Sequence, residues 1–201
     1  MLDKWNERFS SNEYAYGKEP NIIFKEELEK LKPGKILLPA EGEGRNAVFA
    51  AKLGWDVTAF DYSEKAREKA LKLAEENGVH FKYEISTIED YDFKENEFDA
   101  IGLVFCHIHE DEREQLHHKL VHSLKQNGHI IMVVYDVNQL KYGTGGPKEK
   151  EFLYTLENLV EDFIDLDFVS LSSEKIDLSE GLFHKGTSEV IRFTGKKEEN
   201  N

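Results

Sequence analysis

The chain has 201 residues, enough for one domain with a sizeable core, and no Ser/Gly tract, Pro-rich segment or internal repeat divides it. Its 26 Lys and Arg against 40 Asp and Glu give a formal net charge of −14, which disfavours nucleic acid as a partner. No apolar stretch approaches the roughly 18 residues that span a bilayer, and the N-terminus lacks a signal peptide's apolar core. The single cysteine, Cys106, excludes an internal disulfide. We therefore expect one domain over residues 1–201, soluble and cytoplasmic, with no membrane partner.

Residues 35–63 read as a strand, a glycine turn, a helix and a second strand. Gly42 and Gly44 permit a tight turn against which a ligand can approach bare main chain. The helix that follows would present free N–H groups to that ligand, and Gly54 is placed to end it. The second strand ends at Asp61, nineteen residues after Gly42, which is near the spacing at which a carboxylate binds ribose hydroxyls. This pattern predicts a site for an adenosine-bearing cofactor.

The remaining elements alternate between helices and strands. One helix is predicted from Ser63 to Gly78, a second around Leu116, Leu120 and Leu124, which are spaced by four, and a third over residues 152–163. Strands are predicted at 80–85, 98–105 and 129–135. The last two strand-like runs, 166–172 and 188–194, are too close in sequence for a crossover helix and should pair as an antiparallel hairpin, followed by a frayed tail at 196–201. The expected fold class is α/β, a doubly wound, mostly parallel seven-stranded sheet with an antiparallel C-terminal hairpin.

The glycine turn by itself leaves other interpretations open. Gly42-x-Gly44-x-x-Ala47 also fits the dinucleotide fingerprint of NAD-dependent oxidoreductases. The glycines could also serve only tight strand-to-helix packing, with Asp61 capping the helix that begins near Ser63.

Six short motifs, taken in order, separate these interpretations. They are Trp5-Asn6-Glu7-Arg8-Phe9, Tyr14-Ala15-Tyr16-Gly17, Gly42-Glu43-Gly44-Arg45-Asn46, Phe105-Cys106-His107, and the runs at 139–147 (QLKYGTGGP) and 180–186 (EGLFHKG). On these motifs the chain resembles the S-adenosylmethionine-dependent methyltransferases of the seven-stranded Rossmann-like type, and within them the branch related to tellurite-resistance and thiopurine methyltransferases. The resemblance implies a methyltransferase with S-adenosylmethionine as its cofactor.

The resemblance also implies which residues bind the cofactor. Glu41, Gly42 and Gly44 would line its methionine part, Asp61 its ribose, Thr87 and Ile88 its adenine, and Phe105 with Cys106 the floor beneath it; Asn46 and Tyr62 complete the expected set. The chain departs from the family where it has Leu38 and Ala40 in place of an acid and a glycine, and Glu41 is then the nearest acid.

Three residues are candidates for catalysis: His107, His184 and Arg45. His107 follows the fourth strand, where a neutral imidazole can accept a proton from a thiol or orient an oxyanion, although it could also be a structural histidine. His184 could instead be an exposed loop residue, and Arg45 could be paired at the surface. We expect no metal, because His118 and His122 lack placed carboxylates. The aromatic residues within 1–20 would form a lid or a permanently docked helix.

The predicted function is methyl transfer to a small soft nucleophile, a thiol, selenium or tellurium species. The partner would be this small acceptor, and the protein a monomer or homodimer. Two alternatives stay open: a NAD-dependent oxidoreductase, and a module that binds S-adenosylmethionine without turnover, which Leu38 and Ala40 make conceivable.

Overall fold

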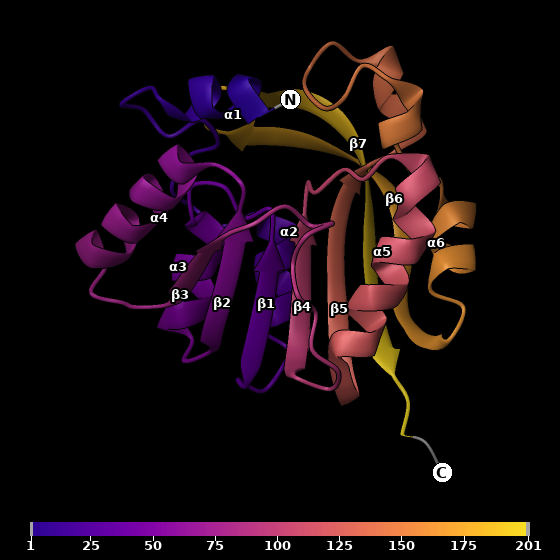
Figure 1. Ribbon diagram of the computed structural model, residues 1–201. Coiled ribbons are helices and arrows are strands. Elements are labelled where there is room, and N and C mark those ends of the chain that lie inside the picture. The colour runs from indigo at the N-terminus through magenta and orange to yellow at the C-terminus, as the bar shows by residue number, and fades with distance from the viewer. Residues whose placement is uncertain (1, 200–201) are drawn as a thin grey trace.

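The computed structural model describes the backbone of residues 2–199 and the side chains of residues 5–199. Seven strands form one sheet in the order β3-β2-β1-β4-β5-β7-β6. The parallel part consists of β1 (Lys35–Pro39), β2 (Asp56–Asp61), β3 (Lys82–Ile85), β4 (Phe98–Val104) and β5 (Leu124–Tyr135). β7 (His184–Lys197) runs antiparallel between β5 and β6 (Leu166–Glu180). The predicted fold class is confirmed (Figure 1).

Helices cover both faces of this sheet. One layer holds α2 (Ile22–Leu28), α3 (Arg45–Lys52) and α4 (Glu64–Glu76), and the other holds α5 (Glu110–Ser123) and α6 (Leu156–Asp162). Successive residues of β5 alternate between the layers, since Ile130 and Met132 pack with α5 and α6 while Ile131 packs with α2 and α3. This strand is apolar on both faces because both faces are buried.

The C-terminal hairpin is longer than the sequence indicated. Its strands continue to Glu180 and resume at His184, so most of the stretch between the two predicted runs extends the ladder instead of connecting it. The alternating residues 175–178 (KIDL) carry this extension, with Ile176 and Leu178 facing the core. The expectation of a frayed tail from residue 196 was wrong for Lys196 and Lys197, which pair within β7, and the Lys197 ammonium donates to the Leu124 carbonyl at 2.7 Å. Residues 200–201 lie outside the described part.

The helix expected over residues 152–163 is shorter than predicted. A 3-10 helix, η2 (Lys150–Phe152), comes first, and α6 begins only after Thr155. Thr155 and Asn158 form a reciprocal capping box that fixes this start. No helix in the described range combines the length and the apolarity that crossing a membrane requires.

Three segments roof the edge of the sheet at which the parallel strands end (Figure 1). They are α1 (Leu2–Phe9) with the loop after it, the far end of the β6–β7 hairpin, and the segment that contains η1 (Val137–Lys141) and η2. The Leu182 N–H donates to the Ala15 carbonyl at 2.8 Å, and a Cβ on Gly181 would overlap the backbone of Gly17. The N-terminal loop and the hairpin therefore meet directly above the carboxyl ends of the strands, where open α/β sheets bind ligands.

Candidate active site

The glycine turn after β1 places main chain next to the ends of β1 and β2. Ala40, Gly42 and Gly44 all have positive φ angles, of 49°, 64° and 85°. Gly44 cannot be replaced without a shift, because a Cβ there would lie 2.6 Å from the Ala70 Cβ of α4. Ala40 stands where the resemblance places a glycine, and the left-handed conformation costs an alanine about 1–2 kcal/mol. The turn therefore keeps its left-handed backbone despite the missing glycine.

Glu41 caps the helix that follows the turn. Its Oε1 accepts the N–H groups of Asn46 and Ala47, both at 2.8 Å, and burial raises the pKa of this carboxyl to about 7. The expectation that the N-terminus of α3 offers free N–H groups was wrong for these two, because the side chain of a glutamate four residues before the helix begins is long enough to reach its first turn. A ligand here meets a capped helix and a carboxylate.

Asp61 connects the glycine turn to the end of β2. One carboxylate oxygen accepts from the Gly42 N–H at 3.2 Å and the other from the Ser63 N–H at 2.9 Å. Since a carboxylate has about four acceptor positions, two remain for a pair of hydroxyl groups. Burial raises the pKa of Asp61 to about 6, and the neighbouring Tyr62 hydroxyl is buried with no hydrogen-bond partner among residues 5–199. This arrangement fits a vicinal diol such as a ribose.

The residues expected at an adenine lie in the loop after β3. The Thr87 hydroxyl donates to Asp90 at 3.1 Å and accepts from the Asp90 N–H at 3.2 Å, so it is used within a local turn. Ile88 packs against the core beside Tyr91, whose ring stacks on Phe60 with centroids 4.2 Å apart. This loop supplies apolar surface rather than a free hydroxyl.

The chain bends sharply after β4. Phe105 has a φ of 54°, unusual for a bulky residue, and its N–H donates to the Val133 carbonyl at 2.7 Å. Cys106 behind it is buried, and burial raises its pKa to about 12. The thiol therefore stays protonated and packs as a small apolar group rather than acting as a nucleophile.

His107 has one ring nitrogen fixed and one free. Its Nδ1 lies 2.9 Å from the Phe152 carbonyl, which can only accept, so Nδ1 carries the proton and Nε2 carries a lone pair. Nε2 is buried and has no partner within the described structure. Burial lowers the pKa of His107 to about 4, so the ring is neutral at pH 7. The site thus contains an unoccupied hydrogen-bond acceptor.

Arg45 and His184 meet at Glu180 near the end of the hairpin. The Arg45 guanidinium donates to Glu180 at 2.8 Å and to the Tyr16 carbonyl at 3.1 Å. Glu180 also accepts from the Asn21 amide at 2.8 Å, and its Oε2 lies 3.2 Å from Nδ1 of His184. Burial alone would raise the pKa of Glu180, but the His184 hydrogen bond and the charge of Arg45 hold it at about 2. This buried network joins the glycine turn to the roof.

The N-terminal aromatics lie against the glycine turn. Trp5 stacks on Phe9 with centroids 5.6 Å apart, and the Phe9 ring would be 3.4 Å from a Cβ on Gly42. Glu43 anchors this segment, since its carboxylate accepts from the Ala15 N–H at 2.7 Å and pairs with Lys69. The aromatic segment covers the turn, and its role as a lid stays a prediction.

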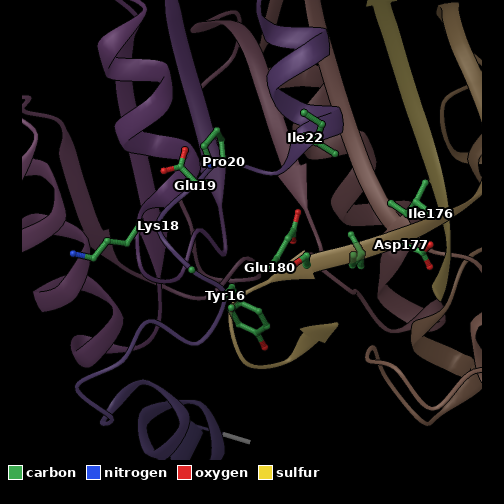
Figure 2. Close-up of a pocket in the computed structure, with 12 residues that line it drawn as sticks. Tyr16, Lys18, Glu19, Pro20, Ile22, Ile176, Asp177 and Glu180 are labelled. Carbon is green, nitrogen blue, oxygen red and sulfur yellow. The ribbon is translucent and has the colours of Figure 1, made fainter. Parts of the chain in front are cut away.

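A shallow groove runs along the outer side of the roof (Figure 2). It has a volume of about 310 Å³ and is lined by residues 16–22, without Asn21, and by residues 176–181 of the hairpin. Glu180 points from β6 toward the segment with Pro20 and Ile22 (Figure 2). None of the predicted cofactor-binding residues lines this groove, so it lies apart from the strand ends.

The structure brings the predicted residues into two adjoining groups. The turn group contains Glu41, Gly42, Gly44, Asn46, Asp61 and Tyr62; the ring group contains Phe105, His107 and His184, with Arg45 joining the two through Glu180. Sequence reasoning gave no role to Glu43, Glu180 or Tyr135. Signals for them existed: an acid between the two glycines, an acid opening the 180–186 motif, and a hydroxyl at the end of an apolar strand.

In the comparison with family models, residues 36–128 match the model described as "Methyltransferase domain". The matched region covers less than half of the 201 residues. It contains β1 to β4, the glycine turn, Asp61 and His107.

Two curated relatives support this match. The chain is 29% identical over 153 residues to phosphoethanolamine N-methyltransferase 2 of Caenorhabditis elegans, covering 72% of this chain and 34% of the relative. It is 34% identical over 101 residues to a ubiquinone biosynthesis O-methyltransferase of Rickettsia canadensis (strain McKiel), covering 50% of this chain and 41% of the relative. The chain therefore spans only about a third to two fifths of the length of these relatives.

Solved structures share the fold of this chain. A structure described under the conversion of a disulfide bond into a thioacetal group during echinomycin biosynthesis matches with a TM-score of 0.80 at 15% identity, covering 100% of this chain and 93% of the other. TehB of Haemophilus influenzae matches with a TM-score of 0.74 at 15% identity, covering 98% and 67%. A 1,6-didemethyltoxoflavin-N1-methyltransferase of Burkholderia thailandensis, solved with S-adenosylhomocysteine, matches with a TM-score of 0.65 at 18% identity, covering 89% and 79%.

The family match and the curated relatives support the enzyme class, and the family with the neighbour that holds S-adenosylhomocysteine supports the cofactor predicted from the sequence. The curated relatives are N- and O-methyltransferases, so the acceptor of this chain is a separate question.

Proposed function

We propose that the chain is an S-adenosylmethionine-dependent methyltransferase that acts on a small soft nucleophile, with residues 1–201 serving as one catalytic unit. The proposed methyl acceptor rests on one observation: within the described residues, Nε2 of His107 is buried and has no hydrogen-bond partner, and the ring is held by the contact of its Nδ1 with the Phe152 carbonyl. Nε2 is a hydrogen-bond acceptor placed just beyond the end of β4, next to the glycine turn across the sheet.

The cofactor side rests on the turn group. Asp61 has acceptor capacity for two ribose hydroxyls, the buried Tyr62 hydroxyl lacks a partner within the described side chains, and Gly42 and Gly44 leave main chain bare. Glu41 holds a carboxylate at the turn that suits the ammonium group of a methionine moiety. When bound, S-adenosylmethionine supplies a methyl group on a positively charged sulfur.

The chain's residues would then align and deprotonate the acceptor. His107 Nε2 would accept the proton that the acceptor loses on methylation, while Nδ1–H stays on the Phe152 carbonyl. Because burial holds the pKa of His107 near 4, it is a weak base. A weak base suits a thiol, with an ordinary pKa of about 8.5, better than an alcohol, which hardly ionises in water. This is why we favour a soft nucleophile although the curated relatives are N- and O-methyltransferases.

We expect the purified protein to methylate phenylmethanethiol faster than phenylmethanol or benzylamine, with S-adenosylhomocysteine formation as the readout. His107→Ala should lower kcat for the thiol about 100-fold, the usual range for losing a proton acceptor, while calorimetry finds S-adenosylhomocysteine affinity unchanged. His109→Asn is the matched control, because His109 is a partly exposed helix cap two residues away.

A full-rate His107→Ala enzyme would refute the role of His107. Tight cofactor binding with no product from any of the three acceptors, or from selenite or tellurite, would favour a binding module without turnover.

A further inference from the structure

One buried tyrosine of the active site, Tyr135, lies against three other rings, and a fourth ring contacts one of those three. Tyr135 ends β5 and stacks on Phe105 at 4.7 Å and on His107 at 5.4 Å between centroids. Its edge meets His184 at 5.7 Å, and His184 in turn lies 4.4 Å from Tyr16. These rings come from the ends of β4 and β5, the hairpin and the N-terminal loop, which are far apart in the chain. The tyrosine therefore lies where the sheet meets the roof.

The Tyr135 hydroxyl is buried and has no partner in hydrogen-bond geometry among residues 5–199. The residue is 1% exposed, and the Ser188 hydroxyl lies near enough to lower the pKa of the phenol. Burial raises the pKa of this phenol, so it stays a protonated donor. Leaving a buried hydroxyl unpaired weakens folding, and neutral phenylalanine would fill the same space without that cost. A ligand that pairs with the hydroxyl gives a physical reason for its presence.

The glycine loop after η1 is shaped around this tyrosine. A Cβ on Gly145 would lie 2.9 Å from the Tyr135 hydroxyl oxygen, and a Cβ on Gly146 would lie 2.8 Å from its ring. Both glycines have positive φ angles, of 146° and 78°. The Gln139 amide holds the loop by donating to the Gly145 carbonyl at 3.3 Å. The loop thus fits closely over the hydroxyl while supplying it no partner.

We infer that Tyr135 is a specificity-determining contact for the methyl acceptor: its hydroxyl donates a hydrogen bond to the reacting group while His107 Nε2 accepts one from it. This inference rests on the proposed function and deepens it. A group that accepts and donates at once is an uncharged X–H group, as in a protonated thiol.

Charge on the described side chains points to the same acceptor. An oxyanion needs an unpaired cation, but Arg45 is bound to Glu180 and the Tyr16 carbonyl. Arg8 lies between the rings of Trp5 and Phe183, 4.7 Å and 4.5 Å from their centroids, and donates to the Tyr16 hydroxyl. Among residues 5–199, the charge of Arg45 is therefore neutralised by a carboxylate, and the Arg8 guanidinium is held between two rings with one of its N–H groups already used. This favours the neutral over the anionic members of the soft nucleophiles.

The test is calorimetric binding of phenylmethanethiol to the protein saturated with S-adenosylhomocysteine, where no methyl group is available. Tyr135→Phe should weaken phenylmethanethiol about tenfold, leave S-adenosylhomocysteine affinity unchanged, and raise Tm by about 2 °C because an unpaired hydroxyl is removed. Tyr154→Phe is the matched control: this buried tyrosine also neighbours His107, but its hydroxyl accepts from the Ile108 N–H at 3.5 Å, so its loss should lower Tm and leave thiol affinity unchanged. Sodium tellurite should bind the wild type more weakly than the thiol.

Each outcome bears on one claim. If S-adenosylhomocysteine does not bind the wild type, the proposed function fails. If it binds but Tyr135→Phe keeps full thiol affinity, or loses Tm as Tyr154→Phe does, Tyr135 is structural and the inference is overturned. Tellurite binding tighter than the thiol would also overturn it.

Discussion

Glu180→Ala should destabilise the protein by about 3–5 kcal/mol, because it leaves the buried Arg45 guanidinium without its partner. The side chains of the pair are 7% and 12% exposed, and Glu180 also loses its contacts with Asn21 and His184. At roughly 2–4 °C per kcal/mol for a chain of this size, Tm should fall by about 10 °C. Chemical denaturation with linear extrapolation provides the free energy.

Glu174→Ala is the control for this prediction. Glu174 also lies on β6, but its contact with Arg192 is longer, at 3.8 Å, and Glu174 is 37% exposed, so its loss should cost less than about 1 kcal/mol. The paired replacement Arg45→Met with Glu180→Leu should recover most of the loss, since apolar residues of similar size can replace a buried ion pair. Equal effects of Glu180→Ala and Glu174→Ala would contradict a structural ion pair at Arg45.

The Glu180 effect also has a definite pH dependence. Its pKa is about 2 in the folded state, below the ordinary value of 4.5, so its stabilising contribution is fully present above pH 4.5 and is lost as the pH falls toward 2. The stability difference between wild type and Glu180→Gln should therefore shrink between pH 4.5 and 2.

Asp61→Ala should weaken S-adenosylhomocysteine binding at least 100-fold. The carboxylate would lose two charge-assisted hydrogen bonds to ribose, each contributing about 1.5–3 kcal/mol, and its bonds to the Gly42 and Ser63 N–H groups would no longer order the turn. Isothermal titration calorimetry at pH 7.5 measures the effect. Asp56→Ala, at the exposed start of the same strand, should keep wild-type affinity.

Protonation of Asp61 should have a similar effect in the wild type. Because burial raises the pKa of Asp61 to about 6 and that of Glu41 to about 7, and cofactor binding favours both ionised forms, affinity should be constant above pH 8 and fall below pH 7, most steeply below pH 6. Asp61→Ala should keep only the shallower fall near pH 7 that protonation of Glu41 causes. A wild-type affinity independent of pH between 5 and 8 would contradict the assignment of Asp61 to a ligand hydroxyl.

Much of the fold was predictable because a local pattern in the sequence indicates each parallel strand. The run 98–105 is apolar on both faces, and Gly42 and Gly44 mark a turn that only positive φ angles can make. The hairpin was underestimated because its outer half, near Ile176 and Leu178, alternates with charged residues and so contains no continuous apolar run.

The site was predictable where it depends on the course of the backbone. It was less predictable where it depends on contacts between side chains that are distant in the sequence. Asp61 follows from its position at a strand end, but the use of Glu41 as a helix cap depends on a side chain folding back over five residues. The Arg45–Glu180 pair joins positions 135 residues apart, and the isolation of the Tyr135 hydroxyl depends on four separate segments. No local pattern encodes either.

The most direct test of the central claim is calorimetric titration of the wild-type protein with S-adenosylhomocysteine and, in parallel, with NADH. We expect micromolar binding of S-adenosylhomocysteine with a stoichiometry of one per chain and no binding of NADH, as Asp61 and the capped glycine turn suit an adenosyl group next to a methionine moiety. Binding of NADH alone, or of neither ligand, would contradict the account.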